Sequence, residues 1–368
     1  MSGTSLDGID AVLVDFPAGN SGRMKVVRHA HQPFADSLRN ELLALNSPGA
    51  NELHRAALAA NALTVAYAEI IGHLLADAGV SAIQVEAIGA HGQTVRHRPG
   101  EFDGSGYSLQ LMNGALLAER SGIDVVCDFR SRDVAAGGEG APLVPAFHAA
   151  RFTRPDEDVA VLNLGGIANL TLLPATGAVR GFDCGPGNGL MDGWCQTHQG
   201  TAFDDGGQWA ASGSVQPGLL ATLLADAYFD RLPPKSTGRD LFNADWLQSR
   251  LDAHGALAAV DVIATLAELT VRAVIDAINR HQPTTLTLLV CGGGAFNDHL
   301  MRRLAELRPQ GVVLSTATAG VLPGQVEALA FAWLARAFGR REAGNLPSAT
   351  GAAGERVLGA LYPALVRV

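Results

Sequence analysis

The chain has 368 residues, of which 48% are hydrophobic and 17% charged, and its formal net charge of −9 gives a sequence pI near 5.6. This length predicts about two domains, and the composition is typical of a compact soluble enzyme rather than a disordered or fibrous chain. The acidic balance argues against nucleic acid as the main partner, because duplex binding needs a clustered basic face.

The positions of the cysteines and lysines exclude further classes of protein. The four cysteines show no C-x-x-C spacing, so we expect a reducing cytoplasm and no disulfide framework. Only Lys25 and Lys235 are lysines, and neither lies in a G-x-x-x-x-G-K-[ST] stretch, which excludes a P-loop. No segment resembles a signal peptide and no apolar run reaches about 18 residues, so we expect no membrane partner.

The first informative motif is the glycine-containing segment Ser2-Gly3-Thr4-Ser5-Leu6-Asp7-Gly8-Ile9-Asp10, which leads into a predicted strand at Ala11 to Val14. Such a hairpin can direct backbone amides and hydroxyls at one anion, and Asp7 or Asp10 can help to hold hydrated Mg²⁺. The alternative is an ordinary turn without a ligand. Because the motif lies so close to Met1, a further strand before it remains an open question.

The rest of the first half alternates helices and strands, as α/β folds do. Helical spacing predicts helices at Asn51 to Ala78 and at Gly106 to Ser121, and apolar runs predict strands at Val85 to Ala90 and Asp124 to Cys127. Polar residues follow both strands, where open α/β folds place ligand contacts. They are His91, Gln93, Thr94, Arg130 and Asp133, and the alternative for each is loop hydrogen bonding, including an Arg130 to Asp133 ion pair. The glycine-rich stretch Ala135 to Pro145 is the best candidate for a hinge.

The second half opens on another hairpin, Asn163-Leu164-Gly165-Gly166-Ile167-Ala168-Asn169, between two apolar strands. A long helix is predicted at Val260 to Asn279, and a strand at Thr285 to Val290 leads into Cys291-Gly292-Gly293-Gly294. Further helices are predicted from about Asn297 and at Gln325 to Phe338. The similar opening hairpins suggest a distant structural duplication of the two halves.

Two acidic residues are candidates for chemistry. Asp183 follows the apolar Gly181-Phe182 pair and precedes the rigid turn Gly185-Pro186-Gly187-Asn188, which can aim its carboxylate into a cleft. Taken alone, an Asp before a glycine turn is usually a turn-former. Glu327 falls in the first turn of a predicted helix, where an isolated acid is most often a partner of the helix dipole. The triple glycine is not a G-x-G-x-x-G fingerprint, which argues against a nicotinamide cofactor.

Four segments together resemble the anhydro-N-acetylmuramic acid kinase family: the first hairpin, Gly89-Ala90-His91-Gly92-Gln93-Thr94, the second hairpin, and Gly181-Phe182-Asp183-Cys184-Gly185-Pro186-Gly187-Asn188. The resemblance spans nearly the whole chain. It implies an α/β, two-domain actin-like ATPase (ribonuclease H-like) fold with an interdomain cleft that holds ATP and sugar. We expect domain I at residues 1–133 plus about 343–368, and domain II at residues 134–342.

The resemblance also implies a role for each candidate residue. Asp183 becomes the general base, and Glu327 works beside it. ATP contacts fall on both hairpins and the glycine run: Gly3, Thr4, Ser5, Leu6, Asp7, Gly8, Ile9, Asp10, Gly165, Gly166, Gly292, Gly293 and Gly294. Mg²⁺ is assigned to Asp7 and Asp10. Sugar contacts are assigned to His91, Gln93, Thr94, Arg130, Asp133, Gly187 and Asn188, and the loop Ser236-Thr237-Gly238-Arg239-Asp240 is expected to close over substrate.

The implied reaction couples hydrolysis to phosphorylation in peptidoglycan recycling. Water opens the 1,6-anhydro ring of anhydro-N-acetylmuramic acid, and the freed O6 accepts the γ-phosphoryl group of ATP, giving N-acetylmuramic acid 6-phosphate and ADP. Two other functions remain open at this point: an ordinary sugar kinase without ring hydrolysis, and a nucleotide-driven binding protein of the actin or chaperone type. The expected partners are the amino sugar and ATP, with a homodimer left open.

Overall fold

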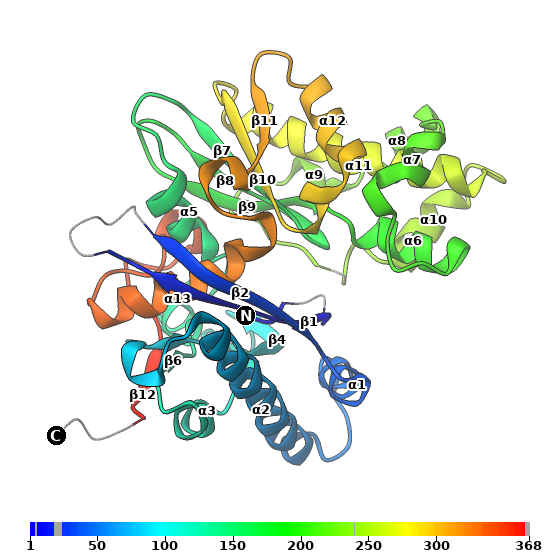
Figure 1. Ribbon diagram of the computed structural model, residues 1–368. Coiled ribbons are helices and arrows are strands. Elements are labelled where there is room, and N and C mark those ends of the chain that lie inside the picture. The colour runs from blue at the N-terminus through cyan, green and yellow to red at the C-terminus, as the bar shows by residue number, and fades with distance from the viewer. Residues whose placement is uncertain (4–5, 18–23, 239, 365–368) are drawn as a thin grey trace. The chain divides into compact units, whose positions relative to one another are not determined.

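The computed structural model describes residues 1–3, 6–17, 24–238 and 240–364 (Figure 1). These residues form two compact units, one from Met1–Arg151 together with Glu327–Val368 and the other from Phe152–Val326. We call them unit 1 and unit 2. Each contains both helices and strands, so the expected α/β class is confirmed.

The division between the units differs from the sequence expectation, which placed it after residue 133 and near residue 343. Leu143, from the segment expected in domain II, packs with Val126 and Phe129 in one buried cluster. Helix α13 (Val326–Gly339) contributes Phe331 and Leu334 to the same cluster. Shared apolar packing therefore assigns both segments to unit 1, and no composition change in the sequence marks this boundary.

The sheet of unit 2 has the strand order β11-β10-β7-β8-β9. Strand β8 runs antiparallel to β7 and β9, whereas β10 runs parallel to β7 and β11. Read from β9 to β11 and numbered along the chain, this order is third, second, first, fourth, fifth, which is the ribonuclease H-like arrangement expected from the resemblance. The strands are β7 (Val159–Leu164), β8 (Ile167–Leu173), β9 (Arg180–Pro186), β10 (Thr287–Cys291) and β11 (Val312–Ser315).

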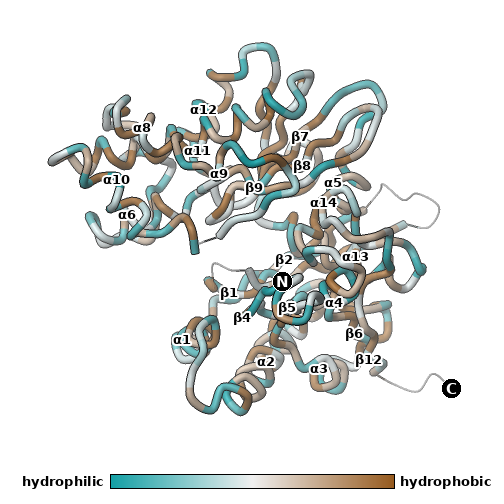
Figure 2. Tube along the Cα trace, turned by 180° about the vertical axis from the view of Figure 1, so that it is seen from behind, coloured by the Kyte–Doolittle hydropathy of each residue, from teal (hydrophilic) through white to brown (hydrophobic). Residues whose placement is uncertain are grey.

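Apolar residues make up most of β7 and β8, which are mostly brown in Figure 2 and almost wholly buried. Helix α11 lies in the same core and buries 14 of its 23 residues. The helices of unit 2 are α6 (Gly189–Gln199), α7 (Gln208–Ser212), α8 (Pro217–Leu224), α9 (Ala227–Asp230), α10 (Ala244–Leu251), α11 (Ala259–His281) and α12 (Asp298–Glu306), with 3-10 turns at Asp205–Gly207, Gly293–Phe296, Thr316–Ala319 and Pro323–Gln325.

The strands of unit 1 form three separate small sheets. Strands β1 and β2 make an antiparallel pair, β4 and β5 make a second, and β12, β6 and β3 make a third sheet in that order. The strands are β1 (Gly8–Asp15), β2 (Lys25–Pro33), β3 (Ile88–Gly89), β4 (Gln93–Pro99), β5 (Gly106–Leu111), β6 (Val125–Cys127) and β12 (Ala360–Tyr362).

Helix α2 dominates unit 1 and buries Leu63, Tyr67, Ile70 and Leu74 in its core. By length and composition this helix is long and apolar enough to cross a membrane, but a core helix passes the same test, so the observation is weak evidence. The helices of unit 1 are α1 (Asp36–Ala44), α2 (Glu52–Ala78), α3 (Gly114–Ser121), α4 (Ser131–Val134), α5 (Val144–Phe152), α13 and α14 (Pro347–Thr350), with a 3-10 turn at Ala82–Gln84.

The helix expected at Gly106 to Ser121 is wrong in its first part. Gly106 to Leu111 forms β5, and the helix begins only at Gly114. The burial alternates with a period of two, since Tyr107 and Leu109 are exposed while Ser108 is buried and Gln110 is half-buried, and the segment pairs with β4. The helices expected at Asn51 to Ala78, Val260 to Asn279 and Gln325 to Phe338 are confirmed within two residues at each end.

Candidate active site

Three glycine-containing turns meet at one edge of the unit 2 sheet. They follow β7, β9 and β10, whose carboxyl ends share this edge because β7 and β9 both run antiparallel to β8 while β10 is parallel to β7. Ligands of open α/β sheets bind at this edge. The expected contacts Gly165, Gly166, Gly187, Asn188, Gly292, Gly293 and Gly294 all lie in these turns.

Backbone hydrogen bonds connect the turn after β7 to the turn after β9. The Asn188 N–H donates to the Gly165 carbonyl at 2.8 Å, and the Gly187 N–H donates to the Gly166 carbonyl at 3.0 Å. Gly187 is required here, since a Cβ at this position would lie 2.3 Å from the Gly165 carbonyl oxygen. A Cβ at Gly166 would meet nothing within 4 Å, so the tip of the hairpin faces open space where a ligand can approach.

The third turn packs against the same hairpin. Gly292 has φ +78°, and a Cβ there would lie 2.4 Å from Asn163 Oδ1. Asn188 Nδ2 donates a 2.9 Å hydrogen bond to the Leu164 carbonyl. The glycine run and the second hairpin therefore pack directly against each other. Such packing is required if both are to contact the same nucleotide.

Asp183 lies in β9, directly before the second of these turns. Its backbone is fixed at both polar groups: its N–H donates to the Lys235 carbonyl at 3.1 Å, and its carbonyl accepts from the Tyr228 hydroxyl at 2.8 Å. Its side-chain Oδ2 accepts a 2.9 Å hydrogen bond from the Thr237 N–H. The expected substrate loop after Lys235 thus contacts the proposed base, although Arg239 lies outside the described residues.

The environment of Asp183 suits a proton acceptor. Burial raises the pKa of its carboxyl to about 6, against the opposing effects of the Thr237 amide and the Lys235 charge. A carboxylate with this pKa is ionised at neutral pH yet basic enough to accept a proton from a reacting hydroxyl. The general-base role that the resemblance implies for Asp183 stays a prediction.

In unit 1, an electrostatic cluster surrounds the second candidate acid, Glu327, in the first turn of α13. The residue is exposed by surface area, yet protein crowds its carboxyl, and this desolvation raises its pKa while Arg130 opposes the shift. Asp10 and Asp7 raise it further through like charge. The negative charges of Asp10 and Asp7 thus oppose ionisation of Glu327 in this region of unit 1.

His91 and Arg130 form a fixed pair beside this cluster. His91 Nδ1 lies 3.0 Å from the Ser2 carbonyl, which can only accept, so Nδ1 carries the proton. Nε2 accepts from Arg130 Nη2 at 2.9 Å. Burial and the Arg130 charge both lower the pKa of His91, in agreement with a neutral ring. Because both ring nitrogens are occupied, we assign His91 the role of orienting Arg130.

Gln93 and Thr94 lie at the start of β4 beside the first hairpin. Gln93 Nε2 donates to the Gly3 carbonyl at 3.0 Å, and among the described residues its buried Oε1 has no hydrogen-bond partner. Thr94 Oγ1 accepts from Gln110 Nε2 at 3.1 Å, and the Oε1 of Gln110 is likewise buried without a partner there. Buried orphan acceptors are costly, so both amides are suited to bind a donor on a ligand. Sequence reasoning missed Gln110, which reading Gly106 to Leu111 as a strand would have placed beside Thr94.

Asp133 does not have the surroundings of a sugar ligand. Its side chain is fully buried, and its Oδ1 accepts from Asn345 Nδ2 at 2.7 Å and from Thr350 Oγ1 at 2.8 Å. Its Oδ2 accepts from the Gly140 N–H at 2.8 Å. We therefore assign Asp133 a structural role that holds α4 to the segment 345–350, in place of the expected sugar contact.

The first hairpin is described only in part, because Thr4 and Ser5 lie outside the described residues. Leu6 and Ile9 are buried in the core of unit 1, and Gly8 is packed against the Gln32 carbonyl, so only backbone groups of these residues remain for a nucleotide. Gly3 already receives the amide of Gln93 at its carbonyl. The hairpin is thus anchored by its apolar side chains.

The expected magnesium residues differ in their surroundings. Asp7 is exposed, whereas Asp10 Oδ1 contacts His31 Nδ1 at 3.1 Å and His29 Nε2 at 3.3 Å. Burial acts against ionisation of Asp10, but the two histidines outweigh it and lower its pKa. Among the described residues no group of three His, Cys, Asp or Glu side chains has metal-ligating geometry. Mg²⁺ that keeps its waters and binds mainly to phosphate needs only one or two carboxylates, so the set fits this mode.

Comparison with known proteins shows similarity to one family over nearly the whole chain. A model of the family described as anhydro-N-acetylmuramic acid kinase matches residues 1–364. A protein of that name from Variovorax paradoxus is 61% identical over 370 residues, covering 99% of this chain and 98% of the relative. Another, from Cupriavidus metallidurans, is 56% identical over 368 residues, covering 99% and 96%.

Among solved structures, the activator of a 2-hydroxyisocaproyl-CoA dehydratase from Clostridium difficile, with bound ADPNP, matches with a TM-score of 0.44 and 11% identity, covering 90% of this chain and 96% of that one. The sequence relatives and the full-length family match are decisive on their own. The chain belongs to the anhydro-N-acetylmuramic acid kinase family.

Proposed function

We propose that this chain is an ATP-dependent kinase that opens the 1,6-anhydro ring of anhydro-N-acetylmuramic acid with water and phosphorylates O6, as part of peptidoglycan recycling in the cytoplasm. Its family membership supports the reaction class and the use of ATP. The single observation that carries the chemistry is the half-buried Asp183 carboxylate, fixed by Thr237 and shifted to a pKa of about 6.

In the proposed reaction, Asp183 accepts a proton from the water that attacks C1. The C1–O6 bond of the anhydro bridge breaks as the new C1–OH bond forms, and O6 then bonds to the γ-phosphorus while the bond from that phosphorus to the β-phosphate oxygen breaks. ADP leaves, and the proton held by Asp183 returns to solvent. A correctly placed base of this kind contributes about 10² to 10⁴-fold to rate.

The nucleotide is assigned to the glycine turns of unit 2 and to the first hairpin of unit 1. The exposed tip at Gly166 and the close packing of Gly292 against Asn163 support this assignment, because both leave backbone amides near an edge where ligands bind. Mg²⁺, when bound, would neutralise charge on the transferring phosphoryl group. Asp7 and Asp10 are the residues proposed to contact it, directly or through water.

The sugar is assigned to the region of Gln93, Thr94 and Arg130. The unpartnered Oε1 of Gln93 supports this, since an amide or hydroxyl of an amino sugar would satisfy it. The role of Glu327 beside Asp183 remains a prediction from the resemblance, as does the cleft expected between the two domains.

Isotope incorporation tests the proposal directly. We expect ADP release that depends on the anhydro sugar, and a product with one oxygen atom from ¹⁸O-water at C1 and phosphate at O6. Phosphorylation without the label would point to an ordinary sugar kinase. ATP turnover that ignores the sugar would point instead to a nucleotide-driven binding protein.

A further inference from the structure

Asp183, Tyr228 and Lys235 of unit 2 form a closed ring of three hydrogen bonds. The Asp183 N–H donates to the Lys235 carbonyl at 3.1 Å, and the Tyr228 hydroxyl donates to the Asp183 carbonyl at 2.8 Å. Lys235 Nζ closes the ring by donating to the Tyr228 carbonyl at 3.2 Å. Each residue thus donates one bond and accepts one, so a displacement of any of them disturbs the other two.

The ammonium group of Lys235 is buried in this ring. Its residue is only 9% exposed, and Nζ also donates to the Phe229 carbonyl at 3.3 Å. None of the ion pairs between described residues includes Lys235. A buried cation held by carbonyl groups instead of a carboxylate is costly, and burial lowers the pKa of Lys235. The other titratable groups around it are Cys184, Asp230, Arg231, Asp276, Arg280 and His281.

Lys235 also begins the loop that orients the Asp183 carboxylate. Thr237 lies two residues further on, and its N–H donates to Asp183 Oδ2 at 2.9 Å. The Thr237 hydroxyl is buried and has no hydrogen-bond partner among the described residues, which suits contact with a ligand. The ring therefore fixes the backbone of Asp183 and the start of the loop that holds its side chain.

A purely structural role for Lys235 is the alternative. Tyr228 and Phe229 belong to the short helix α9, and carbonyl groups at the end of a helix favour a nearby cation. Such a cap would stabilise unit 2, but it would have no effect on the ionisation of Asp183. The two roles therefore differ in a measurable property.

We propose that Lys235 is a positioning residue for the reaction: its ammonium group closes the ring and thereby holds the Thr237 amide on the Asp183 carboxylate. The inference rests on the proposed function, in which Asp183 is the base. Its positive charge acts in the same direction, since the Thr237 amide and the Lys235 charge both lower the pKa of Asp183 against the larger effect of burial.

A pocket of about 210 Å³ reaches Lys235 from the side away from the carboxylate. Cys184, the next residue of β9, lines this pocket, and successive side chains of a strand point to opposite faces. A small amine that enters the pocket can therefore replace a shortened Lys235 side chain without meeting the Asp183 carboxylate.

Lys235→Met tests the inference because it keeps the length of the side chain and removes its charge. We expect kcat to fall by about ten- to a hundredfold, with little change in KM for ATP. The acid limb of kcat/KM should move to higher pH, since two influences that lower the pKa of Asp183 are weakened. Hydrogen exchange at the Thr237 amide should be roughly tenfold faster. Lys25→Met is the matched control, because Lys25 is the only other lysine and is exposed, and it should behave as the parent does.

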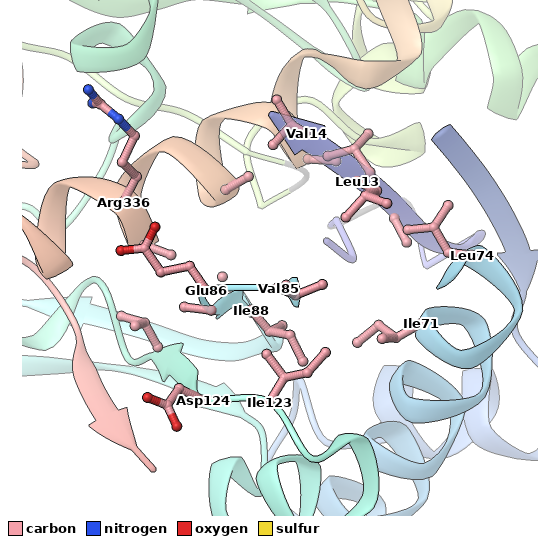
Figure 3. Close-up of a pocket in the computed structure, with 18 of the residues that line it drawn as sticks. Leu13, Val14, Ile71, Leu74, Val85, Glu86, Ile88, Ile123, Asp124 and Arg336 are labelled. Atoms are coloured by element: carbon pink, nitrogen blue, oxygen red, sulfur yellow. The ribbon is translucent and has the colours of Figure 1, made fainter. Parts of the chain in front are cut away.

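A second control separates positioning from stability. Leu74 belongs to α2 in unit 1 and borders the open cavity of about 670 Å³ shown in Figure 3. Its side chain is buried, so Leu74→Ala should lower the urea midpoint. The acid limb of kcat/KM should stay in place, since all members of the ring lie in unit 2.

Chemical rescue tests the charge itself. In Lys235→Ala, propylamine supplies the missing Cγ, Cδ, Cε and ammonium group and can enter through the pocket beside Cys184. We expect propylamine to raise kcat of Lys235→Ala several-fold and to return the acid limb toward that of the parent. Propan-1-ol, which has the same carbon chain without the charge, should have neither effect.

An unchanged acid limb and unchanged Thr237 exchange in folded Lys235→Met would overturn the inference, because Lys235 would then only cap α9. Equal rescue by propan-1-ol and propylamine would also overturn it. If Lys235→Met does not fold, Lys235→Arg takes its place. Slow Thr237 exchange with kcat within a few-fold of the parent then supports the inference, whereas slow exchange with a tenfold loss of kcat contradicts it.

The exchange measurement also keeps this inference separate from the proposed function. A parent protein without sugar-dependent turnover would refute the proposed function, yet exchange at the Thr237 amide would still show whether Lys235 holds the loop on Asp183. Normal sugar-dependent turnover of folded Lys235→Met would refute the inference alone.

Discussion

The backbone N–H of Thr237 donates a 2.9 Å hydrogen bond to Oδ2 of Asp183. This contact connects a loop far along the chain to the carboxylate that we propose as the base. It fixes the direction of the carboxylate and favours its ionised form, while burial acts the other way and prevails. The balance leaves Asp183 with a pKa of about 6, close to the pH at which a general base is most useful.

Replacing the carboxylate should therefore remove turnover without unfolding the protein. For Asp183→Asn we expect a loss of about 10² to 10⁴-fold in kcat, because the amide keeps the shape but cannot accept a proton. ATP binding, measured by calorimetry, should be unchanged. Asp230→Asn is the matched control, since the Asp230 side chain is 89% exposed and should leave kcat near that of the parent. Near-normal turnover of Asp183→Asn would remove this residue from the mechanism.

The pH dependence follows from the same pKa. Only the ionised carboxylate can act as a base, so kcat/KM should fall tenfold per pH unit below about pH 6 and level off above it. Stability should change in the opposite sense. Because the pKa of Asp183 is raised on folding, its ionisation costs stability as pH rises from about 4 through 6, and Asp183→Asn should be more stable at pH 7 by on the order of 1 kcal/mol. Urea unfolding of both proteins at pH 4 and pH 7 measures this difference, which should vanish at the lower pH.

Tyr228 should act on Asp183 through the backbone. Its hydroxyl donates to the Asp183 carbonyl at 2.8 Å, and the centroid of its ring lies 4.7 Å from Lys235 Nζ. In Tyr228→Phe the carbonyl loses its donor while the ring remains, so we expect a stability loss of about 0.5–1.5 kcal/mol. If the bond positions the base, kcat should fall several-fold with little change in KM for ATP. A loss of stability with unchanged kcat would limit Tyr228 to a structural role.

Asp133 should behave in the opposite manner, with a large effect on stability and a small one on chemistry. Both carboxylate oxygens of Asp133 accept hydrogen bonds, which come from Gly140, Asn345 and Thr350. In Asp133→Asn, an NH₂ group, which is a donor, would replace one of these two acceptor oxygens. Leaving buried donors without acceptors costs about 1–3 kcal/mol for each group. We expect a clear drop in the denaturation midpoint, with KM for the sugar unchanged in the fraction that folds. A raised KM at normal stability would return Asp133 to the sugar site.

The sequence indicated the second half of the fold more completely than the first. Hairpin glycines, a long helix with a broad apolar face and a strand before Gly292 mark unit 2 clearly, because β7 and β8 are almost wholly buried and α11 buries 14 of its 23 residues. In unit 1 the strands are short and half-buried, and β3 has only 2 residues, so their pattern is weak. The strand at Gly106 to Leu111 is an example of a weak pattern. Its alternation of exposed and buried residues is short, and the helical spacing of the residues that follow it led to the prediction of one long helix.

The candidate site was predictable as a set of residues, but not as a set of roles. Asp183 and the glycine turns could be found because strand ends and tight turns leave a sequence signature. The hydrogen bonds from Asn345 and Thr350 to Asp133 could not be predicted from the sequence. Asp133 lies more than 200 positions before both residues, and only tertiary packing brings it to them. Gln110 was missed for a similar reason, since its neighbour Thr94 lies on the paired strand.

The glycine run after β10 offers a prediction that separates folding from nucleotide binding. Gly292→Ala should destabilise unit 2, because φ +78° is unfavourable for alanine and the new Cβ would lie 2.4 Å from Asn163 Oδ1. Gly293→Ala should fold normally, since its Cβ would meet only Asn188 Nδ2 at 3.7 Å, yet it should weaken ATP binding if this backbone approaches the nucleotide. Gly324→Ala, with nothing within 4 Å, is the control for both measurements. If Gly293→Ala binds ATP as tightly as Gly324→Ala does, the nucleotide lies elsewhere, and the run serves only to connect β10 to the next element.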